Sequence, residues 1–160
     1  MAYSAPSVRV YGELINPAAW NQLVNNQLHF ASPPLARTVF LNTTNIDTNS
    51  TAFVDASTTN LSLSLNTERG NRVYAEAAFV GLTTAVAPVH FDLALDGTRA
   101  SPWPNGLAQV DGSTDGHLTI FGVWTGVPVG AHVVRLQFKT SDISANARIT
   151  LGPVSMKAWE

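Results

Sequence analysis

The chain has 160 residues, of which 45% are hydrophobic and only 12% are charged, with a formal net charge of −2. This size and composition predict one domain with a real core and argue against disorder of the chain's body. The nine scattered Lys and Arg residues exclude a basic footprint for nucleic acid, the lack of cysteine excludes disulfides, and no apolar run approaches the ~20 residues of a membrane span.

Residues 1–31 predict an extended arm followed by one short helix. The first six residues lack a charged segment followed by an apolar run, so we expect no secretory signal and synthesis in a cytoplasm. Asn16 is a good N-cap and Pro17 suits the first position of a helix over about 17–29. The apolar side chains that recur on one stripe of this helix are Trp20, Leu23, Val24 and Leu28.

The apolar stripe needs a partner, because a lone helix of this length is marginal in water. That partner is either the β-domain or another chain. The four stripe residues are therefore candidates for oligomerisation or attachment, and the partner remains open at this point.

Ser32-Pro33-Pro34 ends the helix and marks the start of a second unit over 32–160, since proline cannot continue a helix. Residues 42–49 are rich in Thr and Asn and predict a loop. Strand signals follow one another at 37–41, 52–56, 60–65, 72–82, 89–95, 118–125, 132–139, 147–151 and 154–159. About eight strands joined by turns too short for crossover helices predict an all-β, antiparallel jelly-roll sandwich.

The stretch 98–116 is the longest irregular one, and loops of this length are usually functional or packed against a neighbour. Trp103 stands between two prolines, where it either contacts a ligand or partner or folds back to cap the sandwich. The residues of this loop that are candidates for ligand or interface contacts are Trp103, Asn105, Asp111 and Asp115.

The acidic part of this loop superficially resembles a calcium loop. The twelfth position after Asp111, where a calcium loop has a bidentate Glu, holds Gly122. Asp-Gly pairs are also common in tight turns, so we expect turns here and no bound metal or cofactor; the alternative is a weak calcium site in this loop.

No arrangement of residues predicts catalysis. The sequence has no Gly-x-Ser-x-Gly motif, and its carboxylates are scattered over strands and turns. The four histidines have no chelating spacing. His90 and Asp92 share one face of a strand, where they either begin a metal or acid–base site or make a surface or turn pairing, and no third partner is evident. His132 at a strand start predicts a structural hydrogen bond. We expect no enzymatic activity.

Several apolar side chains alternate to the outside of the predicted sandwich and lack an obvious cover. Phe121, Val123 and Val133 have this position, while Trp124 and Trp159 lie in strand patterns as core or subunit-contact residues. These side chains and the helix stripe together predict a stable oligomer.

Two segments resemble small bacteriophage virion proteins. Residues 11–28 (YGELINPAAWNQLVNNQL) resemble their opening of Gly-Glu followed by an Asn-rich short helix. Residues 126–140, which contain Gly-x-His-x-Val-x-Leu-Gln, resemble a strand of phage jelly rolls akin to the C1q/tumour-necrosis-factor fold.

This resemblance implies a virion structural subunit that is made in the host cytoplasm and is commonly a trimer. We expect a non-enzymatic capsid decoration protein whose partners are its own copies and the major capsid protein or tail proteins, with no nucleic acid or membrane partner. The alternative is a phage tail or receptor-binding module that recognises a host surface glycan through the 98–116 loop.

Overall fold

The computed structural model describes residues 35–111, 115–150 and 152–160. The arm, the helix, its stripe of Trp20, Leu23, Val24 and Leu28, and the boundary after residue 31 therefore lie outside the described residues. In the described ranges, no helix has the length and apolarity needed to cross a bilayer.

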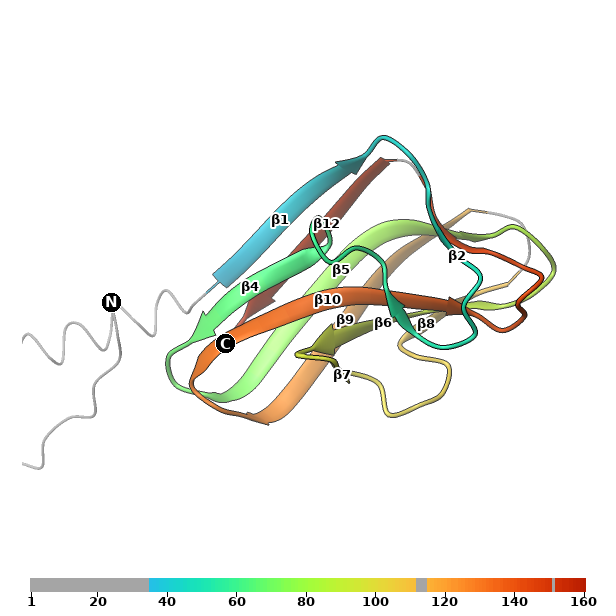
Figure 1. The fold of residues 1–160 in the computed structure, drawn as a ribbon. Coiled ribbons are helices and arrows are strands. Elements are labelled where there is room, and N and C mark those ends of the chain that lie inside the picture. Colours follow the sequence, from blue (N-terminus) through green and yellow to red (C-terminus); the bar gives the residue numbers. More distant parts are fainter. Residues whose placement is uncertain (1–34, 112–114, 151) are drawn as a thin grey trace, which may run out of the picture.

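Twelve strands make up the secondary structure of the described chain (Figure 1). They are β1 (Leu35–Asn42), β2 (Ile46–Thr48), β3 (Val54–Asp55), β4 (Ser62–Thr67), β5 (Asn71–Thr83), β6 (Val89–Leu95), β7 (Thr98–Arg99), β8 (Ala108–Val110), β9 (Gly116–Val127), β10 (Gly130–Thr140), β11 (Ala147–Ile149) and β12 (Gly152–Trp159).

The strands form two antiparallel sheets that pack face to face. One sheet has the order β1-β12-β5-β11-β2, with β9 on the other side of β5. The second has the order β3-β10-β6-β7, with β4 also paired to β10 and β8 also paired to β6. Two short strands continue the line of longer ones. β11 and β12 pair with successive parts of β5, β2 pairs with β11, and β1 pairs with β12.

With the short strands grouped in this way, the sandwich has eight strand positions. The first pairs with the last (β1/β2 with β11/β12), the second with the seventh (β3/β4 with β10), the third with the sixth (β5 with β9) and the fourth with the fifth (β6 with β7/β8). This nested pairing is the strand order of a jelly roll. The predicted all-β jelly-roll sandwich is confirmed.

The core lies between the sheets and follows the period-2 alternation of the strands. On β5, Val73, Ala75, Ala77 and Phe79 are buried. The ring of Phe79 lies 4.8 Å from that of Phe91 on β6, and Phe91 in turn stacks 6.4 Å from a ring on β10, that of Phe138. Burial of each large side chain contributes about 1.5–3 kcal/mol before entropy is subtracted.

Three stretches differ from the sequence-based prediction. Residues 42–49 are not all loop, because β2 forms there against β11, and its Asp47 pairs with Arg148 at 2.7 Å. Only Val54–Asp55 of the predicted strand 52–56 is a strand, and the irregular stretch 98–116 contains β7 and β8. These short strands are set by their pairing with β11, β10 and β6, which the local sequence does not reveal.

Candidate functional site

The outer face of the sheet β1-β12-β5-β9 is the best candidate for a functional surface. Its inward side chains are buried in the core, and the alternate ones point away from the sandwich. Cross-strand register arranges twelve outward side chains in three rows across the four strands: Leu35–Trp159–Tyr74–Val123, Arg37–Lys157–Glu76–Phe121 and Val39–Ser155–Ala78–Thr119. The pairing of β12 with β5 ends at Ser155 and Ala78, and beyond them the face continues as two separate pairs, Leu41–Pro153 and Val80–His117. These sixteen residues are called the outer face below.

Three aromatic rings gather at one end of the outer face. Tyr74 stacks on Trp159 with a centroid distance of 5.8 Å, and Phe121 lies 6.2 Å from Tyr74 and 5.9 Å from Trp159. The Lys157 ammonium lies 5.3 Å from the Trp159 ring and pairs with Glu76 at 3.0 Å. We call Tyr74, Phe121 and Trp159 the aromatic cluster. Phe121 is 48% exposed, so the cluster faces solvent and not the core.

The margin of the outer face along β1 is aliphatic. Leu35, Val39 and Leu41 on the edge strand β1 are 59%, 74% and 65% exposed. Single exposed apolar side chains are normal, but a contiguous set on one face marks an interaction surface. Apolar groups therefore lie along β1 and at the aromatic end of the outer face, and the two sets meet where Leu35 pairs with Trp159.

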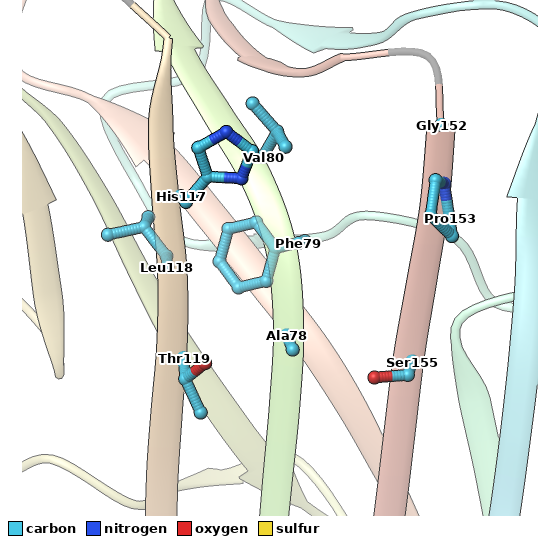
Figure 2. A pocket seen from close by; sticks show the side chains of 9 residues that line it. All are labelled: Ala78, Phe79, Val80, His117, Leu118, Thr119, Gly152, Pro153 and Ser155. Carbon is cyan, nitrogen blue, oxygen red and sulfur yellow. The ribbon is translucent and has the colours of Figure 1, made fainter.

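A groove crosses the strands beside the aromatic cluster, and Figure 2 shows its larger part, over β9, β5 and β12. One hollow of about 400 Å³ lies over β9, β5 and β12, and a second of about 180 Å³ lies over β5, β12 and β1, with Ser155 lining both. The short side chains of the directly paired residues Ala78 and Ser155 leave room for the larger hollow, and Ser155 also lines the smaller one. In Figure 2, His117 on β9 and Pro153 on β12 lie on the two strands that flank β5, both toward the same end of the strands relative to Ala78 and Ser155.

The sequence predicted part of this surface. Phe121 and Val123 were expected to point outward without a cover, and both are exposed. Val133, expected to be similar, is partly buried on β10 in the other sheet, and Trp124 is a core residue whose indole N–H donates to the Thr98 carbonyl. Tyr74 and the groove were missed, because their identification needs the strand order.

Trp103 does not cap the sandwich. Its side chain is 71% exposed, while its backbone is held by hydrogen bonds. The Arg99 guanidinium and the Gly106 N–H donate to the Trp103 carbonyl, and the Trp103 N–H donates to Ser101 Oγ. Asn105, in the same turn, is also exposed. The structure therefore displays Trp103 on an anchored loop.

The buried carboxylate of Asp92 anchors this loop. It accepts hydrogen bonds from the backbone N–H groups of Leu93 and Ser101 and from Arg99, at 2.8, 3.3 and 3.2 Å. Burial raises the pKa of Asp92, and the hydrogen bonds and the Arg99 charge offset this only in part. The guanidinium of Arg99 also lies 4.5 Å from the ring centre of Phe53. The sequence did not predict this network.

The acidic residues of the loop do not form a metal site in the described chain. Asp111 and Asp115 are exposed, and the Asp111 carboxylate accepts from the Gln109 amide. Residues 112–114 lie outside the description. Across the described ranges, no three His, Cys, Asp or Glu residues are placed to hold a metal ion.

The expected structural role of His132 is confirmed. Its Nδ1 lies 2.6 Å from Asp96 Oδ2 and its Nε2 lies 2.9 Å from the Pro128 carbonyl. The hydrogen bond to Asp96 raises the pKa of His132 despite partial burial. His90 shares one side of β6 with Asp92, but the Asp92 carboxylate accepts a hydrogen bond from the loop at Ser101. Burial lowers the pKa of His90.

Comparison with known proteins gives similarity of fold. No protein-family model and no curated protein matches the chain. The solved structures with a similar fold include the CBM36-1 domain of a multidomain xylanase from the hindgut metagenome of Trinervitermes trinervoides, with 13% identity, coverage of 78% of this chain and 97% of that one, and a TM-score of 0.40. They also include Eiger TNF from S. frugiperda, with 10% identity, coverage of 80% and 93%, and a TM-score of 0.42.

A third similar structure is that of T=1 particles derived from infectious bursal virus, with 13% identity and a TM-score of 0.46. The match covers 81% of this chain but only 36% of the viral one. At such identities the likeness concerns the fold alone. The jelly-roll assignment therefore rests on the strand pairing of this chain.

Proposed function

We propose that this protein is a non-enzymatic structural subunit of a bacteriophage virion, a homotrimer that decorates and stabilises the capsid shell. The observation that supports this most directly is the outer face, with its aromatic cluster and the exposed Leu35, Val39 and Leu41. A subunit that assembles buries such an apolar surface against its partner, whereas in a monomer the same surface stays exposed to water at a cost in free energy.

The energetics favour burial of this face against protein. Covering apolar surface contributes about 25 cal/mol per Å², so several exposed side chains together supply several kcal/mol against the entropy cost of association. Of the charged groups on the face, Lys157 and Glu76 pair with each other, so Arg37 is the cation that a partner surface has to match. The trimeric state and the phage origin follow from the resemblance of residues 11–28 and 126–140.

The other partners in this proposal are the major capsid protein or tail proteins of the virion. Residues 1–31, with the stripe of Trp20, Leu23, Val24 and Leu28, supply the contacts for oligomerisation or attachment. Such a coat function requires no cofactor and no catalytic residue.

The test is the oligomeric state in solution. We expect sedimentation velocity at micromolar concentration to give a trimer for the wild-type chain and a monomer for Phe121→Asp, which places a charge in the aromatic cluster. Val129→Asp is the matched control, because Val129 is 62% exposed on the β9–β10 turn and not on the outer face. A wild-type chain that is only monomeric would contradict the proposal.

A second candidate function is supported by Trp103. An exposed aromatic ring on an anchored loop can stack on a sugar ring, so the chain would be a tail or receptor-binding module that recognises a host surface glycan. The copy number in purified particles separates the two functions. Hundreds of copies per particle fit a decoration protein, and a few copies fit a tail component.

A further inference from the structure

We infer that the groove of the outer face receives the apolar stripe of residues 17–29 from a neighbouring copy of this chain. The inference rests on the proposed self-association and identifies the surface that accepts the stripe. Three observations support it: the dimensions of the groove, its chemistry, and the place where the described chain begins.

The groove and the predicted helix have matching lengths. The groove floor is the row Val39–Ser155–Ala78–Thr119, which crosses four strands. At about 4.8 Å between strands, β1 and β9 lie about 14 Å apart, or about 19 Å with the width of the outer strands included. A helix over residues 17–29 would be about 20 Å long. Lying across the strands, it would cover the whole floor.

The chemistry of the groove suits an uncharged apolar stripe. The floor has short side chains and is bounded on one side by Leu41, Pro153 and Val80. The other side, in the smaller hollow, is charged: Arg37, Glu76 and Lys157 line it, and the last two pair with each other. The stripe brings no charge that would compete with this ion pair. The remaining side of the helix is rich in Asn and Gln and would face water.

The start of β1 favours a neighbouring copy over the chain's own groove. Leu35 pairs with Trp159, at the aromatic end of the face, and the groove floor crosses β1 at Val39, about 13 Å further along the strand. To reach its own groove, the chain would have to reverse direction between residues 29 and 35. Pro33 and Pro34 oppose this reversal, because they favour an extended path.

Cysteine cross-linking tests the inference cleanly, because the chain has no cysteine of its own. Full-length Leu23→Cys and Ser155→Cys variants, one of them carrying a size tag, are co-expressed and then oxidised. Each chain has one thiol, so any disulfide joins two chains. We expect a disulfide-linked heterodimer from this pair. Ser64→Cys, exposed on β4 in the other sheet, replaces Ser155→Cys in the control and should give none.

A second measurement does not depend on thiol geometry. Ser155→Arg fills the groove from an exposed position and should weaken self-association at least tenfold in sedimentation equilibrium, whereas Ser64→Arg should leave it unchanged.

The outcomes separate this inference from the proposed function. If the wild-type chain is oligomeric but the 23–155 pair does not cross-link and Ser155→Arg associates normally, the groove is not the acceptor and the proposed function stands. If a chain with both cysteines forms only an internal disulfide, the stripe covers its own face and the inference is wrong. If the wild-type chain is monomeric, both fail.

Discussion

His132 is a buried histidine whose two ring nitrogens both face oxygen acceptors, Asp96 Oδ2 and the Pro128 carbonyl. Only the doubly protonated ring can donate to both, which agrees with the raised pKa of His132. The ring thereby ties the turn after β9 to the turn after β6. Arg135 is the other charged group that acts on Asp96.

A pH dependence of stability follows from this clamp. Because the pKa of His132 is raised on folding, its contribution is fully present below the unfolded value of about 6.5 and is lost as the pH rises through the folded pKa. The pKa of Asp96 is lowered: burial alone would raise it, but the hydrogen bonds from His132 and Val133 outweigh burial. The contribution of Asp96 to stability is therefore lost only as the pH falls toward this lowered pKa.

Urea unfolding from pH 5 to pH 9 should therefore show a fall in stability on the alkaline side that His132→Gln removes. Parallel curves for the two proteins would contradict this assignment.

At the scale of elements, the contact between β5 and β6 depends on the lack of a side chain at Gly81. A Cβ there would lie 2.6 Å from Cζ of Phe91, whose ring is fully buried between those of Phe79 and Phe138. We expect Gly81→Ala to cost about 1–3 kcal/mol in urea unfolding, because the ring cannot move freely.

Gly116 provides the control for this substitution, since it pairs directly with Gly81 across β5 and β9. A Cβ at Gly116 would meet a Val110 methyl group at 3.1 Å, a milder contact. Equal changes in stability for the two variants would mean that the Phe91 ring can adjust and that the close contact at Gly81 has no cost of its own.

The elements with strict alternation could be predicted from the sequence, because a period of two is a property of the strand itself. The predicted strand 89–95 coincides with β6, and 72–82 lies within β5. β2 could not be predicted, because Ile46-Asp47-Thr48 becomes a strand through β11 and the ion pair with Arg148. The groove was equally hidden, since it depends on Ala78 and Ser155 being directly paired.

At the scale of the whole molecule, the jelly-roll order brings the first and last strands together. β1 therefore begins beside Trp159, near the C-terminus, and this end of the sheet is further fixed by Glu160. The Glu160 carboxylate accepts hydrogen bonds from the backbone N–H groups of Glu68 and Arg69, in the turn before β5. The segment before residue 35 thus joins the molecule at the aromatic end of the outer face (Figure 1).

Removal of residues 1–31 tests whether this segment serves attachment while residues 32–160 fold without it. The core cluster seen in the described chain is built from residues of the two sheets and their loops, so the truncated chain should fold, with a melting temperature close to that of the full chain. It should fail to join particles, because the stripe is gone. Trp20→Ala should likewise weaken assembly more than stability, since a large side chain buried against a neighbour contributes about 1.5–3 kcal/mol. Thermal unfolding and co-sedimentation with particles measure the two effects separately.

Two outcomes would contradict this prediction. If the truncated chain is unfolded, the helix belongs to the domain core. If the truncated chain folds and still decorates particles, the attachment site lies elsewhere, and the loop around Trp103 is the next surface to test.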